Sequence, residues 1–144
     1  MFGFLKKEQS TSKTTDSLVQ AGIAYLTGQG VNEDDQKAFE LFKSAAEQNH
    51  PEGLARLGEM YQYGYGCDCN YEKAFYYYKK SAELGSGRGE FRLGWLYVHA
   101  EFYLPNVKTD MRQAAYYYKR AYEHGYRDQL GILEDFAATG VVPF

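Results

Sequence analysis

Glycine and tyrosine recur along this chain at a constant interval, and this repeat restricts the fold more than any other feature. Two sets of residues keep a spacing of 36: Gly22, Gly58 and Gly94, and Tyr25, Tyr61 and Tyr97. Such a period is typical of stacked supersecondary units, each of which buries its apolar face against its neighbours, so that about three units are needed for stability. The chain contains three copies and the start of a fourth at Leu130-Gly131.

Each copy is predicted to fold as two helices joined by a glycine turn. In the second copy, Leu57, Gly58 and Tyr61 share one face of a first helix over about 53–63. A glycine inside a helix costs about 1 kcal/mol relative to alanine, so its recurrence indicates that a neighbouring helix approaches closely. The second helices are predicted to begin after three polar N-cap residues: Asp34, Asn70 and Asp110. They are predicted to close at residues suited to the left-handed conformation: Asn49, Gly85 and Gly125.

The motifs L-G-x-x-Y and G-x-G, a polar cap and K-A before an aromatic residue resemble Sel1-like repeats, which are relatives of the tetratricopeptide repeat. The resemblance covers about residues 17–124. It implies an all-α fold, a right-handed α-α superhelix (solenoid) of three helix-turn-helix repeats. The expected bounds are about 17–52, 53–88 and 89–125, with a C-terminal capping helix within 126–144. The third copy departs from the pattern, because Ala100 and Phe102 replace turn glycines and its loop is four residues longer.

The first residues, 1–16, are predicted to form a flexible or loosely docked arm. Segment 6–15 is polar and has little to bury, and terminal segments fray. Three apolar residues argue instead for a segment that packs on the array: Phe2, Phe4 and Leu5. They could form a short amphipathic turn that covers the first helix of the array, which has no preceding helix to cover Leu18.

Composition and charge argue against two classes of partner. With 144 residues, of which 44% are hydrophobic, the chain suits one globular domain. Its net charge of −3 provides no basic surface for nucleic acid. No apolar stretch approaches the roughly 20 residues of a membrane span. The lysines at the amino end follow a very short apolar patch, unlike a secretory signal. We therefore expect a cytoplasmic protein that binds neither nucleic acid nor membrane.

The sequence predicts no catalytic residue, no metal site and no cofactor. Cys67 and Cys69 form a C-D-C loop, in which a disulfide would be strained and two thiolates alone make a poor metal site. His50, His99 and His124 are scattered, and no serine or cysteine is spaced to pair with them. Each histidine suits a solvated or capping role. We therefore expect that the protein is not an enzyme.

The resemblance implies that the first helix of each repeat lines a concave, partner-binding face. Six residues at inward positions of these helices are predicted contacts: Glu59, Tyr63, Arg88, Phe91, Trp95 and His99. Because Phe91, Trp95 and Val98 make the third of these helices apolar on both sides, something must cover them.

Two covers are possible for this apolar side. The insertion around 102–104 could fold back, or the capping helix with Ile132 and Phe136 could enclose the Trp95 ring. Alternatively, the side is a partner groove in which Trp95 is the anchor, since aromatic anchors commonly dominate interface energy.

These features predict a non-enzymatic protein–protein interaction module that binds one protein partner as a monomer or weak homodimer. The expected role is that of a cytosolic bacterial adaptor or inhibitor. In size and class the chain resembles immunity proteins, which bind a cognate toxin. A signalling or regulatory scaffold is the alternative. A β-lactamase-like hydrolase of the cysteine-rich Sel1-like class is a minor alternative, because the repeats of that class carry cysteine pairs that this chain lacks.

Overall fold

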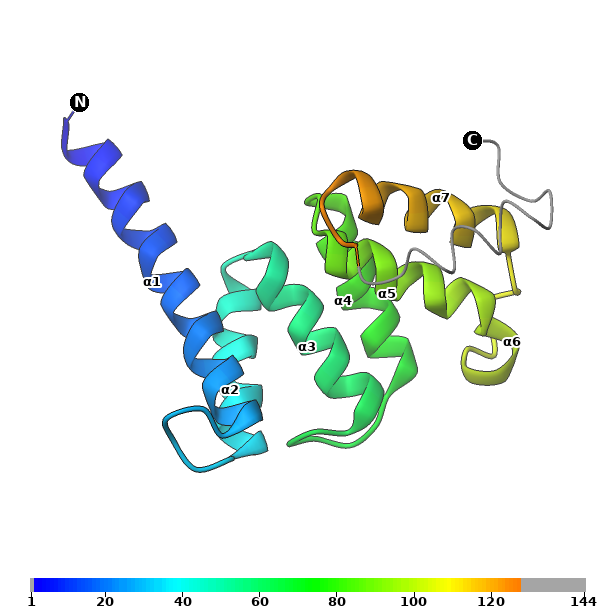
Figure 1. The fold of residues 1–144 in the computed structure, drawn as a ribbon, viewed down its shortest axis with the longest axis horizontal. Coiled ribbons are helices and arrows are strands. Elements are labelled where there is room, and N and C mark those ends of the chain that lie inside the picture. Colours follow the sequence, from blue (N-terminus) through cyan, green and yellow to red (C-terminus); the bar gives the residue numbers. More distant parts are fainter. Residues whose placement is uncertain (1, 128–144) are drawn as a thin grey trace.

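Three helix pairs make up most of the molecule. The computed structural model describes residues 2–127, with side chains from residue 14 onward, and over this part the chain is helical with no strand. The described helices are α1 (Phe2–Thr27), α2 (Asp35–Glu47), α3 (Pro51–Tyr63), α4 (Tyr71–Glu83), α5 (Gly87–Val98), α6 (Ala100–Tyr103) and α7 (Met111–Glu123). The pairs α1–α2, α3–α4 and α5–α7 stack side by side along the molecule (Figure 1). The predicted all-α solenoid is confirmed.

A glycine in each first helix lies directly under an aromatic ring of the paired second helix. A Cβ atom added to Gly58 would lie 2.5 Å from Cε1 of Tyr78, which is far inside van der Waals contact. In the other repeats such an atom would lie 2.5 Å from the Phe42 ring at Gly22 and 3.0 Å from the Tyr118 ring at Gly94. The recurring glycine therefore marks a close helix contact in each repeat, as the sequence predicted.

The predicted helix ends are also confirmed. The Asp34 carboxylate accepts a hydrogen bond from the backbone N–H of Lys37 at 3.0 Å. Asn70 and Asp110 cap α4 and α7 in the same way. At the other end of the second helices, Asn49 has a φ of 55° and Gly85 one of 79°. These positive angles turn the chain back toward the next first helix.

The structure differs from the expected pattern at the amino-terminal end of the array. Helix α1 begins at Phe2, so the segment expected as an arm continues the first repeat helix, and its amino-terminal half projects beyond α2 (Figure 1). How tightly this half is held stays a prediction. The expected capping helix, with Ile132 and Phe136, falls on residues 128–144 and lies outside the described part. None of the described helices combines the length and apolar character needed to cross a bilayer.

Candidate partner-binding site

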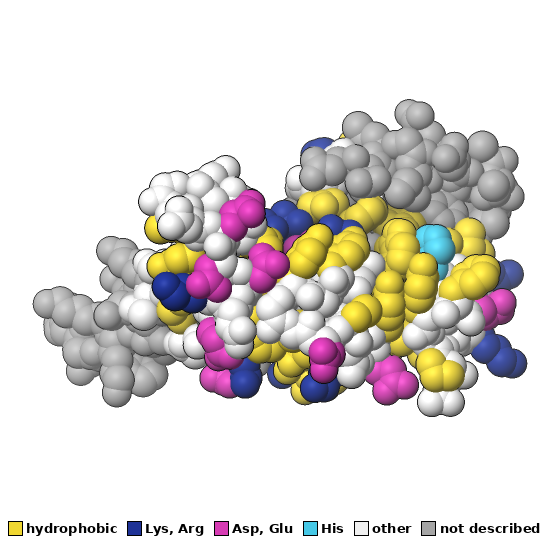
Figure 2. Space-filling model, turned by 90° about the horizontal axis from the view of Figure 1, so that it is seen from below, with side chains coloured by type: hydrophobic (Ala, Val, Ile, Leu, Met, Phe, Trp, Pro, Cys, Tyr) yellow, Lys and Arg dark blue, Asp and Glu magenta, His cyan; other side chains and the backbone are white. Residues whose placement is uncertain are grey.

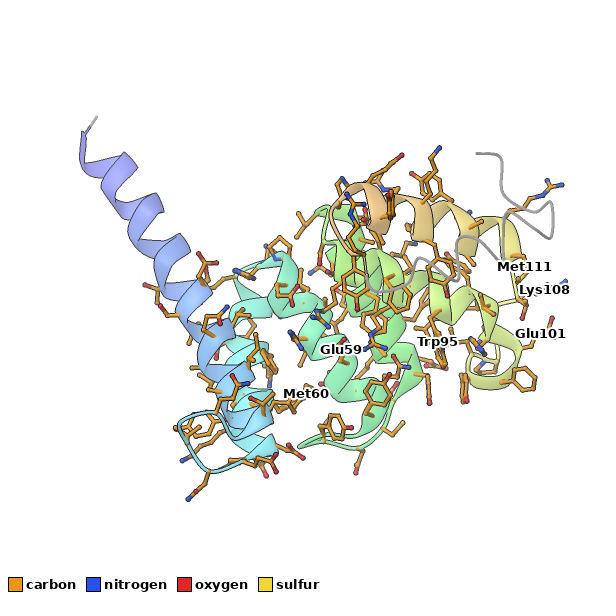
Figure 3. All side chains as sticks on the ribbon, in the orientation of Figure 1. Glu59, Met60, Trp95, Glu101, Lys108 and Met111 are labelled. Atoms are coloured by element: carbon orange, nitrogen blue, oxygen red, sulfur yellow. The ribbon has the colours of Figure 1, made fainter. Side chains whose placement is uncertain are left out.

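Helices α3 and α5 are the first helices of successive repeats, and charged side chains join them. The Glu59 carboxylate of α3 is only 6% exposed. Its Oε1 atom accepts hydrogen bonds from Arg88 Nη1 at 3.1 Å and from Arg92 Nε at 2.8 Å. Figure 3 shows Glu59 on the α3 side that faces α5, and Trp95 nearer the α6 loop. The predicted contact residues Glu59 and Arg88 therefore pair with each other.

Two more side chains extend this arrangement along α3. Glu52 Oε1 accepts from Arg56 Nε at 3.0 Å and from Arg88 Nε at 2.8 Å. Arg56 Nη1 lies 3.5 Å from Glu59 Oε2. We call these five residues the arginine–glutamate network: Glu52, Arg56, Glu59, Arg88 and Arg92. Burial alone would lower the pKa of Arg92, but the charge of Glu59 and its hydrogen bond, together with Tyr78 and Tyr63, raise that pKa by more, so this guanidinium stays charged.

Tyr63 closes one end of the network. Its hydroxyl accepts a hydrogen bond from Arg92 Nη1 at 2.9 Å, and the Arg92 guanidinium also lies 5.6 Å from the ring centroid. The side chain is 46% exposed, and its ring lies 5.6 Å from that of Tyr65. The Tyr63 ring is thus both held by a charged partner and open to an approaching molecule.

A buried tyrosine supports the network from within the repeat. The hydroxyl of Tyr78 donates to Gln62 Oε1 at 2.7 Å. Burial raises the pKa of Tyr78 well above its ordinary value, and the nearby charge of Glu59 adds to the shift. Tyr78 therefore stays neutral and holds α4 against α3.

Trp95 lies in a column of rings rather than alone on a surface. His99 stacks on the indole at 4.1 Å, and the Tyr103 ring stacks 5.8 Å from it. Tyr103 also stacks on Tyr71 at 4.3 Å. We call the four residues His99, Trp95, Tyr103 and Tyr71 the aromatic stack. The 102–104 insertion therefore folds back through Tyr103 and covers part of Trp95, which is half-buried, while Tyr103 itself is 40% exposed.

Phe91 occupies the interior of the third repeat. It is 5% exposed and lies between the rings of Tyr118 at 5.3 Å and Tyr126 at 5.1 Å. The sequence assigns Phe91 to the inward side of α5, and the turn after α7 brings Tyr126 against it. Phe91 therefore offers a partner almost no surface, and we leave it out of the proposed contacts.

Sequence reasoning missed Arg56 and Arg92, and it considered Tyr103 only as part of the insertion around 102–104. The repeat contains a signal for the arginines, since both hold the same repeat position 36 residues apart and Arg92 lies one helical turn after Arg88. The position of Tyr103 carries no such signal, because the insertion that holds it has no counterpart in the other repeats.

The histidines make structural hydrogen bonds. His50 Nδ1 accepts from the backbone N–H of Gly53 at 3.1 Å, so its Nε2 carries the proton and donates to Asp16 at 2.7 Å. His99 Nδ1 donates to the carbonyl oxygen of Trp95 at 2.9 Å. His124 Nδ1 lies 2.7 Å from Glu90 Oε2. These contacts agree with capping and pairing roles.

The two cysteine thiols hydrogen-bond to backbone carbonyls at the carboxyl end of α3. Cys67 Sγ donates to the carbonyl of Met60 at 3.4 Å, and Cys69 Sγ donates to that of Gln62 at 3.1 Å. Both are free thiols. Among the described residues, no group of three or more His, Cys, Asp or Glu side chains is arranged to hold a metal ion.

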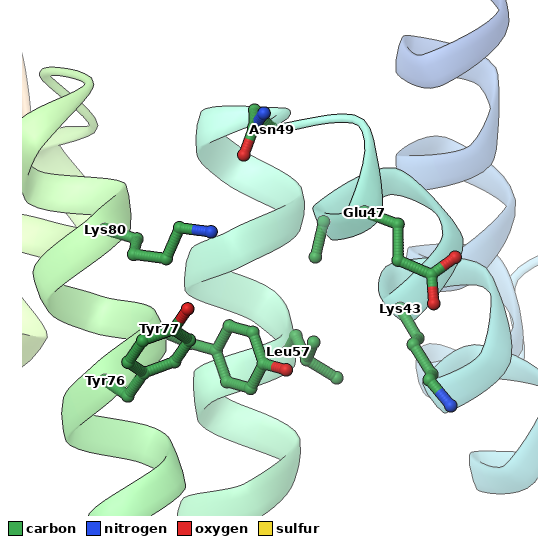
Figure 4. A pocket seen from close by; sticks show the side chains of 8 residues that line it. Lys43, Glu47, Asn49, Leu57, Tyr76, Tyr77 and Lys80 are labelled. Atoms are coloured by element: carbon green, nitrogen blue, oxygen red, sulfur yellow. The ribbon is translucent and has the colours of Figure 1, made fainter.

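A cavity of about 160 Å³ opens between α2 and α4 (Figure 4). Its lining residues are Lys43, Ala46, Glu47, Asn49, Leu57, Tyr76, Tyr77 and Lys80. Pockets for small ligands usually measure about 300–1,000 Å³. This cavity is therefore a surface notch rather than a substrate pocket.

Hydrophobic and basic side chains meet in the same part of the surface. In Figure 2, hydrophobic side chains cover much of the right half of the molecule, and Lys and Arg side chains line the hollow at the upper middle of that view. A surface of this composition suits a protein partner, because aromatic residues and arginine are enriched in interfaces.

Similarity to known proteins agrees with this geometry. The Sel1 repeat matches the chain three times, at residues 15–50, 51–86 and 87–126. The chain belongs to the Sel1 repeat family. Proteins with Sel1 repeats are in general protein-interaction modules, and the fold is typically a binding scaffold. No curated protein is significantly similar to the chain in sequence.

Three solved bacterial structures are similar to this Sel1 repeat protein. A Sel1 repeat protein from Oxalobacter formigenes is 31% identical with a TM-score of 0.78, over 88% of this chain and 50% of that one. The c5321 protective antigen of uropathogenic Escherichia coli strains is 25% identical with a TM-score of 0.73, over 90% and 28% of the two chains. Cysteine-rich protein B of Helicobacter pylori is 25% identical with a TM-score of 0.65, over 85% and 93%. The chain thus spans about half of the Oxalobacter protein.

Proposed function

We propose that this Sel1 repeat protein binds one protein partner, without catalysis, through the surface formed by Tyr63, Trp95, His99 and Tyr103. The observation that carries the proposal is the grouping of partly exposed rings beside an ion-pair network on neighbouring first helices. Aromatic side chains supply large contact area with few rotatable bonds, and they dominate interface energies. Phe102, next to Tyr103 and 82% exposed, extends the same surface outward.

The network gives this surface a fixed shape. Glu59, Arg88 and Arg92 are already paired in the free protein, so little side-chain entropy remains to be lost when a partner docks. Tyr63 is held by Arg92 and Trp95 by its stacked neighbours. In this arrangement the aromatic rings provide affinity, and the charged residues set the orientation of the partner.

For the cellular role, we propose a cytosolic bacterial adaptor or inhibitor, such as an immunity protein that binds a cognate toxin. The bacterial sources of the three similar structures support a bacterial context. A signalling or regulatory scaffold is the second candidate. Growth rescue separates the two: co-expression with a toxin encoded beside its gene restores growth if the protein is an immunity protein, and has no effect if it is a scaffold.

A hydrolase remains the minor alternative, because the similar Helicobacter protein is cysteine-rich by name. In this chain both thiols bond to backbone carbonyls at the end of α3, and His50 caps the same helix at its start. These contacts are typical of structural roles. Turnover of a β-lactam by the purified protein, lost when one histidine is replaced, would favour the hydrolase.

The test of the binding surface begins with capture of the partner from the native cell by the tagged full chain. The purified pair is then titrated calorimetrically with two matched variants. Tyr63→Ala removes a ring from the proposed surface, whereas Tyr76→Ala removes an exposed ring from α4 beside the notch. We expect about a tenfold loss of affinity for Tyr63→Ala and no change for Tyr76→Ala. Equal effects of the two substitutions would contradict the proposed surface.

Trp95→Ala tests the anchor. Truncating an interface anchor commonly costs about 2 kcal/mol or more, which is roughly a thirtyfold rise in Kd. Because Trp95 also stacks on His99 and Tyr103, we expect a modest loss of thermal stability as well. Calorimetry below the melting temperature measures affinity, and thermal unfolding measures stability. A variant that melts early and keeps full affinity would identify Trp95 as a core residue.

A further inference from the structure

We infer that the arginine–glutamate network binds a carboxylate of the partner, so that the partner presents an acidic segment to the surface where α3 and α5 adjoin. The inference rests on the proposed function and adds the chemistry of what is bound. Its basis is the charge balance of the network, its unused hydrogen-bond donors and the rings beside it.

The network carries more positive than negative charge. Three guanidiniums, Arg56, Arg88 and Arg92, share the two carboxylates of Glu52 and Glu59. The local charge is therefore +1, whereas the whole chain carries −3. The three arginine side chains remain between 18% and 23% exposed. The excess charge is thus partly desolvated yet still partly exposed, which makes an added carboxylate favourable.

The arginines also retain free donors. Their Nε and Nη1 atoms make the pairings described above, but none of the hydrogen bonds among the described residues uses an Nη2 atom of Arg56, Arg88 or Arg92. Each Nη2 carries two N–H groups. A guanidinium edge with unused N–H groups matches a carboxylate, which can accept two bonds side by side.

The surroundings restrict the form of the acidic group. Tyr63 lies at one end of the network, and Trp95 follows Arg92 by one turn of α5. A carboxylate seated on the guanidiniums would therefore have aromatic rings beside it. We expect an acidic side chain within a segment that also carries apolar residues, rather than a freely diffusing anion.

The third repeat shows what a purely structural pair looks like in this protein. Glu90 of α5 is fully buried and accepts from Arg120 Nε at 2.9 Å, with His124 on its other oxygen. There one carboxylate meets a single arginine. The network differs, because Glu59 alone is shared by three arginines whose side chains remain partly exposed.

The experiment uses the full chain and a peptide of six glutamates, blocked at both ends, with a blocked six-glutamine peptide for comparison. Binding is followed by the side-chain Nε–H signals of Arg88 and Arg92 in NMR spectra. We expect these signals to shift in a saturable way with the glutamate peptide, and less at high salt because ions screen the contact. A second glutamate peptide with a free carboxyl terminus tests whether the network binds a main-chain carboxylate instead of a side-chain one. We expect it to bind no more tightly than the blocked glutamate peptide.

Glu52→Gln provides the sharpest variant, because the amide keeps an acceptor oxygen for Arg56 and Arg88 while the network charge rises to +2. We expect about threefold tighter binding of the glutamate peptide. Glu72→Gln changes the net charge equally at an exposed position in the first turn of α4 and should have no effect. Arg92→Gln should weaken binding about tenfold, whereas Arg112→Gln on α7 should not.

Equal binding of the two peptides, no gain with Glu52→Gln, or a gain of the same size with Glu72→Gln would overturn the inference. If the cognate partner still loses affinity with Tyr63→Ala in that case, the proposed function stands and only the acidic chemistry is wrong. If Arg92→Gln unfolds the protein, the Glu52→Gln and Glu72→Gln comparison still decides.

Discussion

At the scale of single residues, the smallest side chains determine how closely the helices approach. Gly58 leaves room for the Tyr78 ring, and that ring in turn positions its hydroxyl on Gln62. The same position holds Gly22 and Gly94 in the other repeats. These sites could be predicted from the sequence because glycine is unfavourable inside a helix unless a neighbouring helix must approach closely there. The glycine recurs at the same position in all three repeats, which indicates such an approach in each.

Gly58→Val should strongly destabilise the protein. The new Cβ would lie 2.5 Å from the Tyr78 ring, and overpacking of this kind typically costs about 1–3 kcal/mol or more. Urea unfolding followed by circular dichroism measures the loss. The penalty of the smaller change Gly58→Ala should shrink in a Tyr78→Ala background, where the ring is absent. An unchanged melting temperature for Gly58→Val would show that the contact is not close.

Other residues could not be placed from the sequence, and the reason is physical. The exposure of the Phe91 ring depends on Tyr126, which stacks on it after the chain has turned at the end of α7. Whether Trp95 is free depends on Tyr103, which belongs to the insertion. Helical periodicity assigns a side chain to a face, but it does not state which loop residue returns to cover that face.

At the scale of elements, α1 and α6 depart from the repeat. Helix α1 is 26 residues long, against 13 for α2, because it continues without a break into the amino-terminal segment. Helix α6 has four residues and replaces the glycine turn of the other repeats. Both departures occur where the repeat pattern ends or is interrupted, which is where the sequence predicted least.

Deletion of residues 1–12 tests the role of the projecting half of α1. We expect little loss of stability, because this half of α1 extends past α2 (Figure 1) and a projecting helical end opens at little cost in free energy. Thermal unfolding gives the stability, and analytical ultracentrifugation gives the oligomeric state. A drop of many degrees, or a switch from monomer to dimer, would mean that the segment covers the apolar face of the first repeat.

At the scale of the whole molecule, buried tyrosines link stability to alkaline pH. Burial raises the pKa of Tyr78, and it also raises that of Tyr97 and Tyr118. In the unfolded chain these hydroxyls ionise near pH 10, while in the folded protein they hold their protons to higher pH. The folded state therefore binds more protons above pH 10, and stability must fall as pH rises from there.

The free energy of unfolding should thus be nearly constant between pH 8 and 9 with respect to these groups and decline above pH 10. Tyr78→Phe should reduce the steepness of the decline, although it also removes the hydrogen bond to Gln62 and costs about 1 kcal/mol at neutral pH. Urea titrations at several pH values measure both effects. A wild-type stability that stays level up to pH 11 would contradict the linkage.

The charged contact between α5 and α7 within the third repeat also favours the correct pairing of the helices. Arrays of similar units can fold with the wrong neighbours, since each first helix fits more than one second helix. Here Glu90 occupies the repeat position of Leu54, and Leu84 that of His124. If α5 took the place of α3 beside α4, the buried Glu90 carboxylate would keep one cationic neighbour, because Lys80 holds the repeat position of Arg120, but it would face a leucine where it now meets His124. Such a misassembled chain would carry an underpaired buried charge, so the correct arrangement is selected by the penalty attached to the wrong one.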